Sequence, residues 1–204
     1  EPWEVMNQAG KPFQVFTPFY KFCTQHIVPR PPAPKPKRLK SASHDLKTEA
    51  LNDWDLIPKN PDWSKKFESY WPIGERGAQQ KLEEFLEKKI NHYATQRDMP
   101  AADMVSRLSS YLHIGAISPH DVWHRAQNSE APARHVQKFL SELGWREFSY
   151  YILYHFPHMR DQNFNPKFNK FPWRTHVQHL EAWQKGQTGY PIVDASMRQL
   201  WEEG

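Results

Sequence analysis

Four side chains in the stretch SELGWREFSYY (residues 141–151) have the types and the spacing to line a ligand pocket. On a helix, positions i, i+3, i+4 and i+7 share one face. These positions are held by Glu142, Trp145, Arg146 and Ser149. Arginine offers a planar fork of donors, tryptophan a stacking plane, and glutamate an acceptor for an amine or a hydroxyl. Because unpaired buried charge is costly, either a ligand or an i, i+4 ion pair of Glu142 with Arg146 must satisfy this stripe.

A second candidate is the string Ser106-Arg107-Leu108-Ser109, which offers two hydroxyls and an arginine near a predicted helix start. Such a position favours anions, so the string could hold phosphate. Serines that merely cap a helix would give the same string, and this alternative stays open.

A metal site is not expected. His120 and His124 stand at i, i+4, but Asp121 is the only adjacent ligand type and lies on the wrong face for a zinc site. The chain also lacks a glycine-rich nucleotide loop, a CxxC pair and a nucleophile elbow.

Helical periodicity dominates the chain after residue 74. From Glu75 onward, apolar residues recur at helical spacing, and further helices are expected at about 103–112, ended by Gly115, and at 132–156. Ser118 and Pro119 have the types of an N-cap and a first helical residue. The apolar positions that define the first and third of these helices are Ala78, Leu82, Phe85, Leu86 and Ile90, and Val136, Phe139, Leu140 and Leu143.

The last part of the chain alternates loop and helix. Residues 161–173 are expected to form an irregular loop, and Thr175 to cap a short helix that ends at Gly186. The sequence GYPIVDASMRQLWEEG opens at a turn and then predicts a helix to the end of the chain. Since no strand pattern follows residue 75, the chain after the linker is predicted to be all-α.

The first 74 residues differ in composition. Residues 12–28 are dense in aromatics and too short for a core of their own, so we expect them to pack on another part, such as a missing domain. Residues 29–40 hold five prolines and five basic residues without an acid, as a solvated linker would. Residues 41–73 are loop-like, with Trp54, Trp63 and Trp71 as expected anchors.

Bulk composition narrows the class of protein. The chain has 204 residues, a formal charge of +4, 14% aromatics and a single cysteine, Cys23. An internal disulfide is therefore impossible, which favours a reducing, cytoplasmic location. The sequence has no apolar run that could span a membrane, and its first residues do not form a signal peptide. A pI near 9.1 suits an anionic partner but is weak evidence for nucleic acid.

Several strings, in order from end to end, resemble the DNA photolyase/cryptochrome family. Any one of them is weak, but their shared order and spacing are specific. The last resembles the form in class I-type cyclobutane-dimer photolyases more than that in (6-4) photolyases. The strings are FTPFYKF, WPIGERGAQQKLEEFL, YATQRDMP, SRLSSYLHIGAISP, LSELGWREF and TGYPIVDASMRQL.

This resemblance implies a deoxyribodipyrimidine photo-lyase, a carbon–carbon lyase that repairs ultraviolet-damaged DNA with light. The family binds FAD non-covalently in an all-α domain. Light-excited FADH⁻ donates an electron to a flipped-out pyrimidine dimer, the ring splits, and the electron returns. A monomeric parent protein without a membrane anchor is expected, and the antenna chromophore stays unknown.

The resemblance also implies roles for single residues. Tyr93 and Val105 to Ser109 correspond to FAD-phosphate contacts, although Val105 stands where many members have threonine. Arg146 corresponds to an arginine at the flavin. Arg146 and Ser149 are both expected to contact the cofactor and the DNA. Glu142 corresponds to the acceptor for the base edge, which also adjoins the cofactor, and Trp145 to the aromatic that packs on the dimer. Trp173 corresponds to the outermost tryptophan of the photoreduction chain.

The family pattern places three segments on this chain. Residues 1–28 are the expected remnant of an N-terminal α/β antenna domain, 29–74 a linker, and 75–204 the first half of the helical FAD domain. Because later family residues would lie beyond Gly204, we expect this chain alone to bind FAD weakly or not at all. A blue-light photoreceptor of the cryptochrome type is one alternative, and a non-catalytic helical fragment that binds DNA or protein is another.

Overall fold

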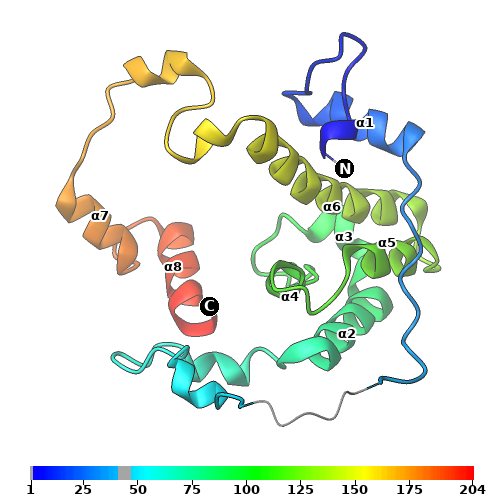
Figure 1. Ribbon diagram of the computed structural model, residues 1–204. Helices are drawn as coiled ribbons and strands as arrows, with labels where there is room; N and C mark the ends of the chain where they lie inside the picture. Colours follow the sequence, from blue (N-terminus) through cyan, green and yellow to red (C-terminus); the bar gives the residue numbers. More distant parts are fainter. Residues whose placement is uncertain (1, 41–46) are drawn as a thin grey trace. The chain divides into compact units, whose positions relative to one another are not determined.

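The computed structural model describes residues 2–40 and 47–204, and every regular element in these ranges is helical (Figure 1). The absence of any β-strand from the described ranges confirms the predicted all-α class. The α-helices are α1 (Phe16–His26), α2 (Gly74–Glu84), α3 (Tyr93–Gln96), α4 (Ser109–His113), α5 (Pro119–Gln127), α6 (Ala133–His155), α7 (Val177–Gln184) and α8 (Pro191–Glu203). Between them lie the 3-10 turns η1 (Pro2–Glu4), η2 (Leu51–Trp54), η3 (Lys65–Ser69), η5 (Ile90–His92), η6 (Pro157–Arg160) and η7 (Pro166–Lys170), and the π-helical turn η4 (Phe85–Lys89).

The chain divides into two compact units. Unit 1 comprises Glu1–Ala33 and Gly74–Pro172, and unit 2 comprises Pro34–Ile73 and Trp173–Gly204. The predicted boundaries at residues 28 and 74 concern the layout of a longer protein, and they stay a prediction.

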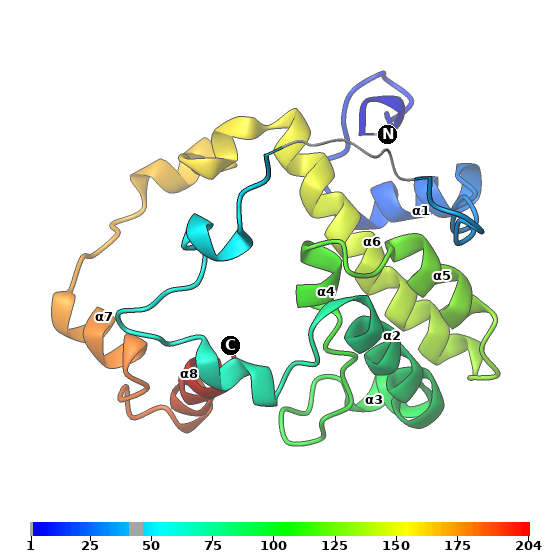
Figure 2. The ribbon, with the colours of Figure 1, turned by 60° about the horizontal axis from the view of Figure 1, so that its bottom comes forward.

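The core of unit 1 forms around α6, which contacts α1, α3 and α5 (Figure 2). Its buried residues Val136, Phe139, Leu140 and Leu143 follow the helical period, which confirms the predicted long helix. Burying one such side chain stabilises the fold by about 1.5–3 kcal/mol. Although α6 has 23 residues, no helix in the described ranges is both long and apolar enough to cross a membrane.

Helix α2 begins one residue before the predicted start and then widens into the π-helical turn η4. Ala78 and Leu82 are fully buried in α2, and Phe85 and Ile90 are buried at either end of the wider turn. The Ile90 N–H donates to the Phe85 carbonyl, the i→i+5 bond of a π-helix. This wider turn places Phe85 and Ile90 one above the other, and both are buried. The ring centroids of Phe85 and of Phe139 on α6 are 4.5 Å apart.

The aromatic N-terminal segment packs on another part of the chain, as expected, and that part is α6. Phe19 of α1 joins a buried cluster with Phe148 and Tyr151. The Tyr151 hydroxyl donates to the Val5 carbonyl at 2.8 Å and accepts from the Phe13 N–H at 2.9 Å. These long-range contacts let a short segment be buried without a core of its own.

The predicted helix at 103–112 is mostly irregular, and α4 begins only at Ser109. Arg107 has a φ of +52°, in the left-handed region that a right-handed helix excludes. An ion pair between Arg107 Nε and Asp103 Oδ1, at 3.4 Å, accompanies this conformation. The helical period was therefore misleading here, because a side-chain contact and a left-handed residue replace the first turns.

Helix α5 starts as the sequence predicts. Ser118 Oγ accepts from the His120 N–H at 3.2 Å, and Pro119 occupies the first helical position. His124 Nε2 lies 3.2 Å from the Pro29 carbonyl and 3.1 Å from the Arg30 carbonyl and donates to them. The start of the proline-rich segment is thereby held against α5.

Unit 2 is built on α7 and α8. The N-cap of α7 is His176, whose Nδ1 accepts from the His179 N–H at 3.3 Å, so the prediction of Thr175 was wrong. An imidazole nitrogen takes the role expected of a hydroxyl. Helix α8 begins at Pro191 and runs to Glu203, which confirms the predicted helix. The predicted loop 161–173 is irregular except for η7.

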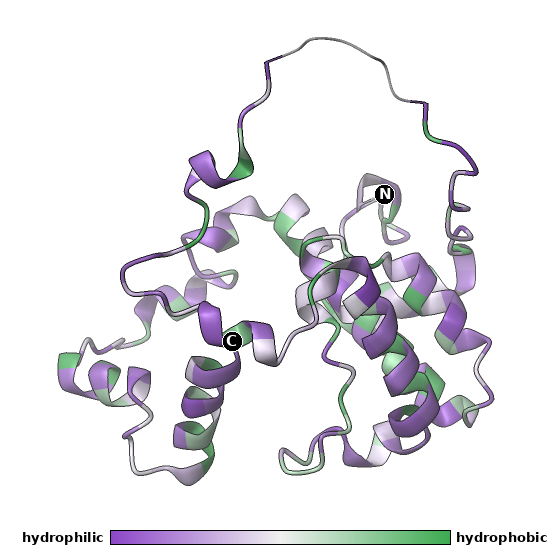
Figure 3. Ribbon diagram, turned by 90° about the horizontal axis from the view of Figure 1, so that it is seen from below, coloured by the Kyte–Doolittle hydropathy of each residue, from purple (hydrophilic) through white to green (hydrophobic). Residues whose placement is uncertain are grey.

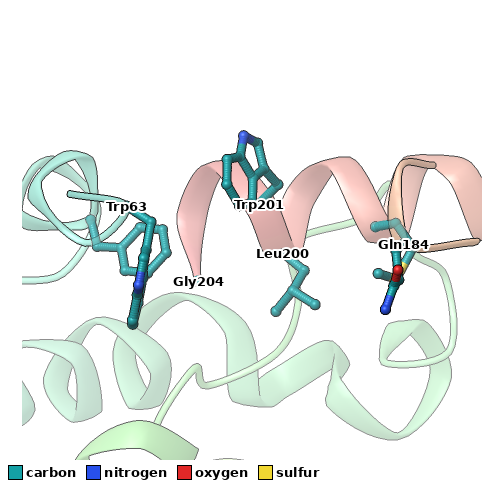
Figure 4. A pocket seen from close by; sticks show the side chains of 7 residues that line it. Trp63, Gln184, Leu200, Trp201 and Gly204 are labelled. Atoms are coloured by element: carbon teal, nitrogen blue, oxygen red, sulfur yellow. The ribbon is translucent and has the colours of Figure 1, made fainter. Parts of the chain in front are cut away.

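The three tryptophans expected as anchors in residues 41–73 differ in their contacts. Trp71 Nε1 donates to the Glu203 carbonyl at 2.6 Å, as an anchor would. Trp63 lines an apolar cavity of about 330 Å³ with Phe67, Met197, Leu200 and Trp201 (Figure 4). Trp54 is 56% exposed, and among the described residues its indole N–H donates only to nearby Glu49, so for Trp54 the expectation was wrong.

Candidate functional site

The polar stripe on α6 is present as predicted. Its two charged residues, Glu142 and Arg146, do not pair with each other but with other side chains. Glu142 forms an ion pair with Arg97, which follows α3, and lies 3.1 Å from Lys138 Nζ. Arg146 donates to Glu147 Oε1 at 2.7 Å instead. The hypothesis of a Glu142–Arg146 pair was therefore wrong, and Glu147 has the structural role of pairing with Arg146.

Trp145 is supported on one side by α1. Its ring stacks on Phe16 with centroids 3.7 Å apart and an interplanar angle of 11°. The side chain is nevertheless 45% exposed. A rigid aromatic plane that is backed by a second ring and open to solvent is suited to stack a flat ligand.

Arg97 links Glu142 to Tyr93. Its guanidinium pairs with Glu142 and lies 5.4 Å from the centre of the Tyr93 ring. Burial opposes the charge of Arg97, but the hydrogen bond to Glu142 and the nearby Tyr93 outweigh burial and raise the pKa of the guanidinium. Glu142 thus faces two cationic side chains, Arg97 and Lys138, that orient its carboxylate.

Tyr93 is a largely buried residue at the start of α3. Its ring packs edge-on against Phe85 and Phe139, both at 5.4 Å. Burial raises the pKa of the Tyr93 hydroxyl, and the Arg97 charge only partly opposes this. The hydroxyl therefore stays protonated at neutral pH and can donate a hydrogen bond.

The segment Val105–Ser109 combines one anchor with exposed donors. Leu108 is 2% exposed and fixes the segment to the core, whereas Val105 and Ser109 are exposed. Within the described ranges the hydroxyls of Ser106 and Ser109 make no hydrogen bond, so they can donate to a ligand. The helix that follows has only five residues, so its dipole adds little and the hydroxyls and Arg107 must provide the anion contacts.

The structure brings most predicted site residues together in unit 1. Arg97 joins Glu142 to Tyr93, and Arg146 NH2 donates to the Leu112 carbonyl of α4 at 3.4 Å. The Ser149 hydroxyl donates to the Trp145 carbonyl at 2.9 Å, so its proton is already used within α6. Trp173 belongs to unit 2 and is 68% exposed, and it is not placed relative to the other site residues.

Three residues of this site were missed by the sequence analysis: Arg97, Lys138 and Phe16. Lys138 stands four residues before Glu142, so its i, i+4 spacing was an available signal. Arg97 and Phe16 had none, because they reach α6 only through the fold. The site as a whole offers an aromatic plane, a fixed carboxylate acceptor and a set of hydrogen-bond donors suited to phosphate oxygens.

Comparisons with known proteins agree with this chemistry. Residues 139–204 match the family model of the FAD binding domain of DNA photolyase. The whole chain is 40% identical to a deoxyribodipyrimidine photo-lyase of Agrobacterium fabrum, covering 43% of it, and 34% identical to Cryptochrome-2 of Arabidopsis thaliana, covering 36% of it. It also matches a crystal structure of a bacterial class III photolyase from Agrobacterium tumefaciens, with a TM-score of 0.94 and 40% identity over 100% of this chain and 43% of that one. The chain thus spans less than half the length of these relatives.

Proposed function

We propose, since this chain belongs to the DNA photolyase/cryptochrome family, that the full-length protein containing it is a deoxyribodipyrimidine photo-lyase. Such an enzyme is a carbon–carbon lyase that repairs pyrimidine dimers in ultraviolet-damaged DNA with light. Two relatives that carry this name are 40% and 34% identical to the whole chain. The observation that carries the proposal is the α6 stripe, where an exposed aromatic plane lies beside a fixed carboxylate.

FAD is the proposed cofactor, and the residues of unit 1 fit it. Ser106 and Ser109 offer hydroxyl donors that bond to none of the residues the structure describes, Arg107 offers a cation, and Tyr93 offers a protonated hydroxyl, all suited to phosphate oxygens. Arg146 offers donors near α4 for the flavin edge. When bound and fully reduced, FAD supplies the light-driven electron that the reaction requires.

Trp145 is proposed to hold the damaged base. A dimer must leave the DNA stack before it can react, and extruding a damaged base costs less than extruding a paired one. The exposed face of Trp145 would replace the lost stacking, worth about 1–3 kcal/mol per base. Because Phe16 backs the ring, the plane need not be ordered on binding.

Glu142 is proposed to accept a hydrogen bond from the edge of that base. Its carboxylate is already oriented by Arg97 and Lys138, so little reorganisation is required. The same cations offset the charge that desolvation would otherwise make costly. Glu142 would thus fix the register of the dimer on the Trp145 plane.

A light-dependent repair assay tests this function. Full-length protein, reduced and illuminated, should remove the dimer from an oligonucleotide that contains a single cyclobutane dimer. Trp145→Ala should weaken binding of that oligonucleotide about tenfold or more, because a stacked base is lost, while Trp145→Phe should retain most of the binding. Equal dimer loss in darkness and in light would contradict the proposal.

A cryptochrome-type photoreceptor is the second candidate, because Cryptochrome-2 of Arabidopsis thaliana is 34% identical over this chain. We expect the presence of both Glu142 and Trp145 to favour repair, since each is proposed to contact the damaged base. A protein that binds FAD and bleaches in light, yet leaves the dimer intact, would support the photoreceptor. We also propose that the full-length protein is cytoplasmic, monomeric and of the class I type.

A further inference from the structure

A chain of ion pairs connects the Val105–Ser109 segment to Lys89, the last residue of the π-helical turn η4. Its side chain is only 14% exposed, and its ammonium lies 2.9 Å from Asp103 Oδ2 and 3.4 Å from Glu84 Oε1. Burial alone would raise the pKa of the Glu84 carboxyl, but Lys89 and Lys81 outweigh burial and lower it. A largely buried lysine is thus neutralised from two elements, one of which is the loop before α4.

Asp103 passes this contact on to Arg107. One carboxylate oxygen of Asp103 accepts from Lys89, and the other lies 3.4 Å from Arg107 Nε. Arg107 is held in the left-handed region, with a φ of +52°. A non-glycine residue adopts this conformation at a cost and keeps it only where its surroundings hold it. Asp103 is therefore a bridge between the buried Lys89 and the one strained residue of the segment.

The exposed ion pairs within single helices of the described residues differ from this bridge. Lys185 and Glu181, for example, are 63% and 56% exposed and belong to one helix, and such pairs contribute little. Lys89 is shielded from solvent, and its partner Asp103 stands fourteen positions further along the chain. The bridge therefore connects two segments, η4 and the loop that carries Asp103 and Ser106 and leads into α4 at Ser109.

We propose that Lys89, through Asp103, is a positioning residue that sets the conformation of Arg107 and its neighbouring serines for the phosphates of FAD. This inference rests on the proposed function, because it assigns the segment a phosphate-bearing ligand. Lys89 itself does not touch the ligand. Without its ammonium, Asp103 loses a fixed position, and the ion pair of Asp103 with Arg107 no longer helps to hold Arg107 in its left-handed conformation.

The test compares two ligands on the full-length protein. Lys89→Met keeps the apolar stem and removes the charge, so the dissociation constant for FAD should rise roughly tenfold. The affinity for riboflavin, which has no phosphate, should not change, and neither should the melting temperature by more than a few degrees. Lys89→Arg should restore FAD binding, and Lys88→Met, on an exposed neighbour, should leave it unchanged.

A double variant sharpens the result. If Lys89 acts through Asp103, Lys89→Met with Asp103→Asn should weaken FAD binding no more than Asp103→Asn alone. Unchanged FAD affinity in Lys89→Met, or an equal loss for riboflavin, would overturn the inference while wild-type FAD binding kept the proposed function intact. A wild-type protein that binds no FAD would overturn both.

Discussion

Unit 1 and unit 2 are both helical, yet different forces hold their residues in place. In unit 1, Leu82, Phe85, Ile90 and Val122 are at most 1% exposed. In the described part of unit 2, the buried residues are only Gly186 and Asp194, a turn glycine and a carboxylate. Figure 3 shows mixed hydrophilic and hydrophobic helices in both units, so hydropathy along the chain does not separate them.

The difference teaches that a helical pattern predicts a helix but not what covers it. The apolar face of α6 is covered by α1, α3 and α5. In unit 2, Trp201 stays 65% exposed, and the start of α8 is fixed by hydrogen bonds to Asp194 from Thr188 and Gly189. Unit 1 should therefore respond to lost apolar volume, and unit 2 to lost polar contacts.

The largest effect is expected at Phe85. Phe85→Ala leaves a cavity between η4, Tyr93 and Phe139, and should lower the free energy of unfolding by about 3–5 kcal/mol. Trp201→Ala removes a larger side chain from unit 2, but that ring is 65% exposed where it lines the apolar cavity and meets Lys66, so the loss should be at most about 1 kcal/mol. Urea unfolding of the full-length variants measures both. Similar losses would remove the distinction between the units.

A smaller effect is expected where α1 crosses α6. A Cβ at Gly144 would lie 2.5 Å from the Tyr20 ring, so in Gly144→Ala either this ring or α1 must shift. We expect a loss of about 1–3 kcal/mol, the usual cost of overpacking. Tyr20→Ala in the same chain should recover part of this loss, because it removes the clashing ring. A Gly144→Ala variant as stable as the parent would contradict tight packing of Tyr20 against α6.

The smallest and most local effect is expected at Asp194. Its pKa is lowered because the Thr188 hydroxyl donates to the carboxylate; burial opposes this, and the N–H groups of Thr188 and Gly189 add to it. A lowered folded-state pKa stabilises α8 above the ordinary carboxyl pKa, and this contribution is lost as the pH falls through the lowered value.

Hydrogen exchange of the α8 amides, followed between about pH 5 and pH 2, measures this loss. Asp194→Asn should remove most of the pH dependence, whereas Asp55→Asn, on an exposed carboxylate, should not. Protection of α8 that stays constant through this range in the parent chain would contradict the assignment.

Much of the fold could be predicted from local sequence signals, and the predictions that failed did so for local reasons. Ser118 and Pro119 marked the start of α5 correctly because a cap and a fixed φ act within one turn. The prediction for 103–112 failed because Arg107 adopts a left-handed φ that periodicity does not reveal. In the site, the stripe from Glu142 to Ser149 could be predicted from spacing, but the ion pair with Arg97 could not.

By itself, the sequence determined the helices, their apolar faces and the residue types of the candidate site, because these depend on neighbours within a few positions. Only the tertiary structure decided the partners. Phe16 reaches Trp145 across more than a hundred residues, and Lys89 reaches Asp103 from another element. Which charge pairs with which, and which aromatic face stays open, depends on distances that arise only when helices pack.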